Sequence, residues 1–107
     1  MKSKSVDLRE AAQRDIDEAV DFYIAQDAHQ AAHAFIDEVE RALDHVCRHP
    51  EAGSPRYAQE LGLPGLRHWP VTGYPCLVFY QDRGERIDVW RVLHGERDIP
   101  AWLIGGV

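Results

Sequence analysis

The chain has 107 residues, of which 45% are hydrophobic and 28% are charged, and its formal net charge at pH 7 is −6. This length and balance are typical of one folded domain and exclude a disordered polyelectrolyte. No apolar run approaches the roughly 20 residues that a membrane-spanning helix needs, so no membrane association is expected. The chain also lacks the overall basic character of nucleic-acid-binding proteins, and we do not expect it to bind DNA on its own.

The N-terminal segment "MKSKSVDLRE" has no apolar core of the kind found in secretion signals. A cytoplasmic location is therefore expected. Two cysteines, Cys47 and Cys76, are too few for a disulfide framework and are expected to be reduced. Because the sequence contains no repeat, low-complexity tract or linker, residues 1–107 are expected to form a single domain.

The first half of the chain predicts a short strand followed by two helices. Residues 5–8 alternate weakly between apolar and polar, which favours an edge strand. Apolar residues then recur every three or four positions and predict amphipathic helices over about 11–26 and 28–48. In the break between them, Asp27 is expected to cap the second helix and Gln30 to reach back, as in a capping box. So short a connection predicts an antiparallel helical hairpin.

The second half predicts strands. Short apolar runs favour strands at 66–69 and 76–81, and "DRGE" predicts a tight turn into a third strand at 86–94. Strict alternation in this last strand places four residues on one face: Ile87, Val89, Arg91 and Leu93. Pro100 is expected to open a short terminal helix with Trp102 as its apolar anchor.

Together these elements predict an α+β fold. It comprises an N-terminal short strand and an antiparallel helical hairpin packed on one face of a small, mainly antiparallel sheet. The other face of the sheet is expected to remain open to solvent or to a partner.

Histidines and carboxylates on the predicted helices do not form a convincing metal site. His29 and His33 are one helical turn apart, as are His45 and His49. A stable site needs three or four ligands, and no further Cys or His completes either pair, so no metal and no cofactor is expected. Four carboxylates of the first helix are interpreted as a solvated face: Asp15, Asp17, Glu18 and Asp21.

Cationic residues cluster along the predicted sheet instead. Arg67, Arg91, His94 and Arg97 each lie on or just beyond a strand, so the fold could bring them together. The alternative is that nearby carboxylates neutralise them in surface ion pairs of little energetic weight, with Asp88, Glu96 and Asp98 as the candidates. The residues alone leave these two interpretations open.

Four segments, "AAQRDIDEAVDFYI", "HPEAG", "GLRHWPVTGYPCLVFY" and "VWRVLHGERD", resemble the RelE/ParE superfamily of bacterial toxins and are most similar to its ParE-like branch. The resemblance covers about residues 5–100 in the family's order. It implies a RelE/ParE-like fold and the toxin of a type II toxin–antitoxin system. It also implies neutralisation by a cognate antitoxin, for which a ParD-like, ribbon-helix-helix DNA-binding protein is expected.

The superfamily contains two activities, and the resemblance favours one of them. RelE-like members cleave mRNA on the ribosome with lysines, two arginines and a C-terminal tyrosine. This chain matches the arginines as Arg67 and Arg97, but residues 57–65 contain no lysine and no tyrosine follows Tyr80. The resemblance therefore favours a ParE-like inhibitor of DNA gyrase that acts by binding, without catalytic residues of its own.

Two alternatives remain open at this point. In a RelE-like ribosome-dependent mRNA endoribonuclease the catalytic residues would be Arg67, His94 and Arg97, with His94 as base or acid. In a degenerate toxin the chain would serve only as an antitoxin partner. For the ParE-like reading, the residues expected to bind a partner or target are arginines, tryptophans and a histidine, types that are frequent at binding hot spots: Arg67, Trp69, Trp90, Arg91, His94, Arg97 and Trp102.

Overall fold

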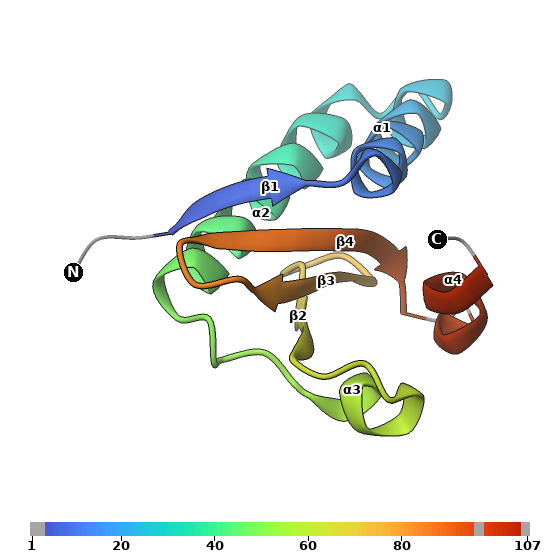
Figure 1. Ribbon diagram of the computed structural model, residues 1–107. Helices are drawn as coiled ribbons and strands as arrows, with labels where there is room; N and C mark the ends of the chain where they lie inside the picture. Colours follow the sequence, from blue (N-terminus) through green and yellow to red (C-terminus); the bar gives the residue numbers. More distant parts are fainter. Residues whose placement is uncertain (1–3, 96–97, 106–107) are drawn as a thin grey trace.

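The computed structural model describes residues 4–95 and 98–105. The described chain forms four strands and four helices, in the order β1 (Ser5–Leu8), α1 (Glu10–Ala25), α2 (His29–Arg48), α3 (Arg56–Leu61), β2 (Leu66–Pro70), β3 (Cys76–Asp82), β4 (Arg86–His94) and α4 (Ile99–Gly105). Helices α1 and α2 lie side by side on one face of the sheet, whereas α3 and α4 lie on the other (Figure 1).

The sheet has the strand order β1-β4-β3-β2. Strands β2, β3 and β4 pair antiparallel, and β1 pairs parallel with β4, from Ser5 opposite Arg86 to Leu8 opposite Val89. This arrangement confirms the predicted α+β class, with a helical hairpin over a mainly antiparallel sheet. The N-terminal edge strand, whose pattern was weak, is present as predicted.

The two long helices begin and end within one residue of their predicted bounds. The predicted cap between them is wrong. Asp27 has a φ of 57°, its N–H donates to the Ile24 carbonyl and the next N–H, that of Ala28, donates to the Tyr23 carbonyl. These bonds form a Schellman motif, so Asp27 terminates α1 and makes no capping bond to α2.

No helix in the described part of the chain is both long and apolar enough to cross a lipid bilayer.

The first core lies between the hairpin and the sheet. The apolar stripes of α1 and α2 supply Ala12, Phe35, Val39 and Val46, and the sheet supplies Val78 and Tyr80, all of them buried. The four helical residues of this core occupy positions that the three-to-four-residue period predicts to face inward.

A β-bulge changes the faces of β4. Tyr80 pairs with Val89 and Phe79 pairs with Arg91, which leaves Trp90 as the extra residue. Beyond the bulge the alternation is therefore shifted by one position. Val92 joins Ile87 and Val89 against the hairpin, whereas Leu93 packs on the opposite side. The strict alternation predicted for this strand is wrong from Trp90 onward.

A second core covers the face that was expected to be open. Leu66, Phe79 and Leu93 of the sheet are buried there by Ile99 and Leu103 of α4, and residues of α3 pack at the border. Helix α3 was not predicted, because six residues are too few to show a helical period. The chain thus covers its own sheet on both sides, and the expectation of an open sheet face is wrong.

Candidate functional site

Arg67 holds the loop that follows α2. Its Nη1 donates to the carbonyl oxygen of Gly53 at 2.7 Å and to that of Glu51 at 3.3 Å. The side chain leaves β2 on the hairpin face, because Leu66 and His68 point to the other face. The guanidinium of this predicted site residue is therefore hydrogen-bonded to backbone carbonyls of its own chain.

Tyr80 fixes the same loop from inside the sheet. Its hydroxyl donates to the Pro50 carbonyl oxygen at 2.8 Å and accepts from the Gly53 N–H at 3.1 Å. Burial raises the pKa of the Tyr80 phenol, although the Gly53 bond and the Arg67 charge act in the opposite direction. The "HPEAG" segment is thereby explained as a loop folded around one tyrosine hydroxyl and one guanidinium.

Arg91 is buried in an ion pair with Asp15. Its Nε and Nη2 each donate to one carboxylate oxygen at 2.8 Å, and the Val92 N–H donates to the same carboxylate at 2.9 Å. A third nitrogen, Nη1, donates to the Trp102 carbonyl oxygen at 3.3 Å. The Asp15 hydrogen bond is the largest of the causes that raise the pKa of Arg91.

Sequence reasoning missed Asp15, which was interpreted as part of a solvated face. Its side chain is only 7% exposed. The signal was its spacing: Asp15 lies three residues after Ala12 and four before Ala19, on the apolar stripe of α1. Of the carboxylates expected to neutralise the sheet arginines, Glu96 lies outside the described residues, and Asp88 does not pair with Arg91. Asp88 instead binds Arg9 and Arg83.

The three tryptophans do not form one surface. Trp69 stacks on His45 of α2 with ring centroids 4.2 Å apart. Trp90 lies on the opposite face, where its Nε1 donates to Gln81 Oε1 at 3.2 Å and the Arg9 guanidinium covers its ring. Trp102 of α4 is 40% exposed and lies beside Arg91. Of the predicted binding residues, the fold brings Arg91 and Trp102 together and separates them from Trp69.

His94 lies in a groove between α1 and the ends of β3 and β4. The groove has a volume of about 530 Å³ and is lined by Asp15, Glu18, Ala19, Phe22, Tyr23, Pro75, Cys76, Val92 and His94. Phe22 at its edge is 61% exposed. Its interior is apolar and the exposed Glu18 lies on its α1 rim, features that suit a partner segment with apolar and basic side chains. Arg97, the remaining predicted site residue, lies outside the described residues.

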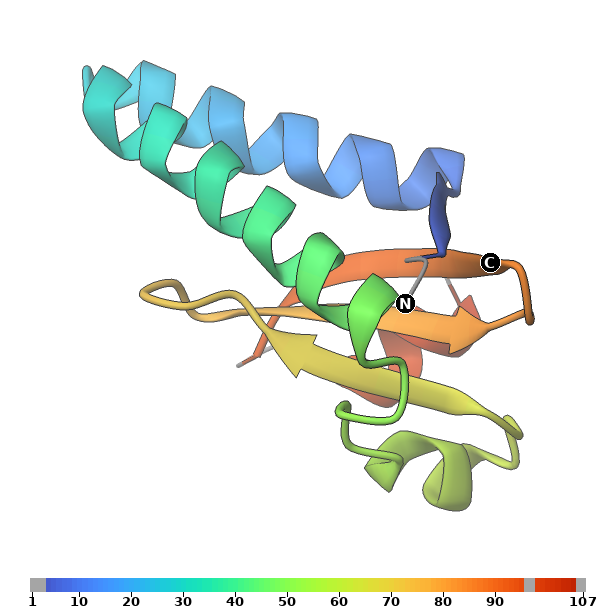
Figure 2. The same cartoon turned by 90° about the vertical axis from the view of Figure 1, so that its left-hand side faces the viewer.

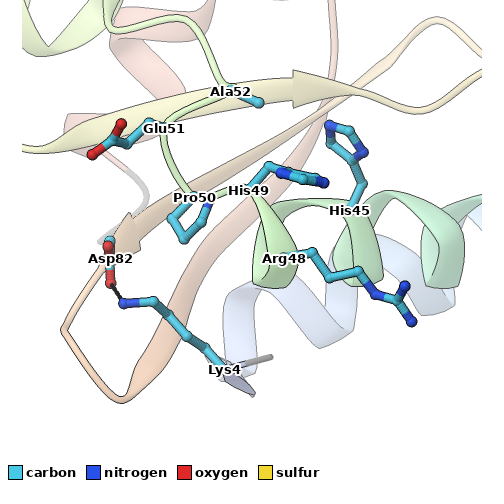
Figure 3. Close-up of a pocket in the computed structure, with 8 residues that line it drawn as sticks. All are labelled: Lys4, His45, Arg48, His49, Pro50, Glu51, Ala52 and Asp82. Atoms are coloured by element: carbon cyan, nitrogen blue, oxygen red, sulfur yellow. Dashed lines mark hydrogen bonds and ion pairs between the residues drawn. The ribbon is translucent and has the colours of Figure 1, made fainter. Parts of the chain in front are cut away.

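A second hollow, of about 700 Å³, lies where the chain leaves α2. Figure 3 shows that its charged side chains do not converge, since Glu51 and Arg48 point in different directions. Lys4 is bound to Asp82 at 2.9 Å, and Arg48 to Asp44 at 3.2 Å. The hollow is therefore a surface depression and does not resemble a catalytic centre.

Comparison with known proteins agrees with this architecture. The model of a family described as "ParE toxin of type II toxin-antitoxin system, parDE" matches residues 6–99. A solved chain titled "Chromosomal ParDE TA system from P. aeruginosa" superposes with a TM-score of 0.70 at 18% sequence identity. The alignment covers 86% of this chain and 96% of that chain, and the likeness supports the fold. No curated protein matches the sequence.

The family match defines the class of protein as the toxin of a type II toxin–antitoxin system. Within the RelE/ParE superfamily, the chain belongs to the ParE toxin family. An antitoxin is accordingly its partner.

Proposed function

We propose that this toxin inhibits DNA gyrase by binding to it in the cytoplasm and carries out no bond cleavage of its own. The observation that supports this proposal is the engagement of the sheet arginines. Arg67 is held by two backbone carbonyls and Arg91 by a buried carboxylate. Cleavage of RNA needs cations that face the phosphodiester and stabilise its developing negative charge. Cations already bound to internal acceptors are poorly placed for that work.

Two assays on the free toxin test the proposal. The first measures supercoiling by purified gyrase, and the second measures the integrity of mRNA on translating ribosomes. We expect loss of supercoiling with intact message. We also expect Arg97→Ala to weaken toxicity more than His94→Ala. Cleaved message with unaffected gyrase, abolished by His94→Ala, would instead establish the RelE-like endoribonuclease, and activity in neither assay would indicate a degenerate toxin.

We further propose that the cognate antitoxin is ParD-like, a ribbon-helix-helix protein, and that one of its segments occupies the groove beside α1. The apolar interior and the exposed Phe22 ring offer apolar area to an amphipathic helix. Glu18 on the rim favours a segment with Lys or Arg at its polar border, whereas the Asp15 carboxylate is already paired with Arg91. The Glu18 carboxylate also disfavours a second copy of this acidic chain as occupant.

Substitution of the exposed ring tests the groove. Phe22→Ser is expected to weaken antitoxin binding by about tenfold or more, the equivalent of about 1.4 kcal/mol. The matched control is Val6→Ser, because Val6 is also an exposed apolar residue, 39% accessible, but does not line the groove. Calorimetric titration of both variants gives the comparison. Equal affinities for Phe22→Ser and the parent protein would exclude the groove as the antitoxin site.

A further inference from the structure

His68 of β2 lies beneath α3 in a cluster of aromatic rings. Its ring centroid is 5.6 Å from that of Tyr57 in α3 and 5.4 Å from that of Phe79 in β3, and these two rings are 5.8 Å apart. Both nitrogens of the imidazole are buried, and neither makes a hydrogen bond within the described part of the chain. A buried polar group without a partner loses its hydrogen bonds to water on folding and destabilises the fold. Such a group is therefore uncommon in a stable core.

The protonated form of His68 is less favourable still. An imidazolium carries a charge and two N–H donors, and the aromatic cluster offers it no acceptor. The charged side chain that acts on the ring is Arg56 of α3, whose positive charge opposes protonation. Arg56 is itself bound by Glu60 at 3.3 Å. Burial first, and the Arg56 charge second, lower the pKa of His68.

The remaining neighbours of His68 do not compensate its charge. Phe79 of β3 is apolar, and Tyr57 presents its ring. Ser54, which pairs with His68 through the backbone, is uncharged. The adjacent Arg67 points to the opposite face of the sheet, toward the loop carbonyls.

Helix α3 is weakly anchored. It has six residues and no buried side chain, and at its N-terminus the Arg56 N–H donates a long bond, of 3.3 Å, to Ser54 Oγ. Tyr57, Ala58 and Leu61 hold it against the second core as partly buried residues. Figure 2 shows that α3 lies below β2, away from the hairpin. Short elements with little buried surface open at lower free energy than the core of a domain.

We infer that α3 is a cover on the sheet that acid releases. Protonation of His68 displaces α3 from Leu66 and Phe79, while α1 and α2 keep their packing on the other face. The neutral imidazole is favoured when α3 is closed. The advantage of the closed state is therefore complete above the ordinary pKa of histidine and declines as the pH falls below it. Each unit by which the closed-state pKa lies below the open-state value shifts opening by about tenfold.

Hydrogen exchange of the full chain at pH 7.5 and pH 5.0, corrected for the intrinsic pH dependence of exchange, measures the opening. We expect backbone amides of residues 56–61 to exchange about tenfold faster at the lower pH, without a matching change in α1 and α2. Nuclear magnetic resonance of the His68 ring should show a depressed pKa. The measurement needs neither gyrase nor antitoxin, so its outcome is independent of the proposed function.

Three variants complete the test. In His68→Phe an apolar ring replaces the imidazole, and the acid response of α3 should disappear. His33→Gln, which removes an exposed histidine of α2, should retain the response. Tyr57→Ala should open α3 at both pH values and return the pKa of His68 toward its ordinary value. An unchanged acid response in His68→Phe, or exchange that rises uniformly through α1 and α2, would overturn the inference.

Discussion

Arg67 has a structural role that its family-matched position does not reveal. Sequence analysis assigns it to partner binding or catalysis, whereas its guanidinium donates to two backbone carbonyls of the loop after α2. The same loop accepts the Tyr80 hydroxyl bond and approaches it closely at Gly53. A guanidinium suits this task because its several donors can satisfy two carbonyls at once.

Replacing Arg67 distinguishes a loop anchor from a binding residue. We expect Arg67→Ala to lower the free energy of unfolding by about 1–3 kcal/mol, because the loop carbonyls lose a charged donor. Urea denaturation measures this loss. The matched control is Arg86→Ala, whose guanidinium lies 3.7 Å from Asp7 on the surface and should contribute little. Unchanged stability with lost toxicity would instead identify Arg67 as a contact to the target.

Position 53 has room only for glycine, because the Tyr80 hydroxyl lies where a Cβ would be. A Cβ at this position would collide with that oxygen and lie 2.9 Å from the His68 carbonyl oxygen. Gly53→Ala should therefore destabilise the protein by roughly 1–3 kcal/mol, as overpacking does. In the Tyr80→Phe background the hydroxyl is gone, and the same substitution should cost less. A double-mutant cycle by thermal denaturation measures the coupling, and additive effects would contradict the proposed collision.

At the scale of elements, the Asp15–Arg91 pair joins three parts of the fold. Asp15 belongs to α1, Arg91 follows the bulge of β4, and the guanidinium also holds the Trp102 carbonyl of α4. The bulge matters here because it shifts the alternation after Val89 by one position, which places Val92 in the first core and Leu93 in the second. One extra residue in a strand thus serves both cores.

Removal of one partner of this buried pair should be severe. Asp15→Ala leaves the Arg91 charge without compensation and should lower stability by about 3–5 kcal/mol. The double variant Asp15→Leu with Arg91→Met should be much less affected, because both charges are removed together. Urea denaturation compares the two. A double variant no more stable than Asp15→Ala would indicate that the Val92 N–H bond to Asp15 outweighs the ion pair.

The sequence predicts best those elements whose periodic pattern of apolar residues extends over many positions. The stripes of α1 and α2 fix their bounds to a residue, and alternation locates β4 correctly as far as Val89. Features made by contacts distant in sequence were missed. The partner of Arg91 is 76 positions away, and the bulge at Trp90 leaves no local signature. The prediction of the candidate site was the least accurate, because a sequence does not distinguish an arginine exposed at the surface from one buried in an ion pair.

At the scale of the whole molecule, carboxylates tie the N-terminal segment to the β3–β4 hairpin. Asp88 binds Arg9 through two bonds and also Arg83, and Asp82 binds Lys4. Burial raises the pKa of Asp88, but the bonds and charges of Arg9 and Arg83 outweigh it and lower the pKa overall. The Lys4 hydrogen bond likewise lowers the pKa of Asp82.

These depressed values predict the response to acid. The stability from Asp88 and Asp82 is fully present above the ordinary carboxyl pKa and is lost as the pH falls through the lowered folded values. Asp88→Asn should therefore reduce stability at pH 7 by roughly 1–3 kcal/mol, and its difference from the parent should shrink below about pH 4. Asp7→Asn, at an exposed pair, is the control. Chemical denaturation across the pH range measures both, and a constant difference would contradict the assignment.

The parallel pairing of β1 with β4 has a consequence for synthesis of the toxin. Ser5–Leu8 emerge from the ribosome well before the strand that receives them, Arg86–His94. Contacts between such distant segments form late, because the intervening chain must be ordered first. Any product that stops before Arg86 lacks the neighbour of its first strand and one wall of both cores. Toxicity should therefore begin only after Arg86–His94 has emerged from the ribosome.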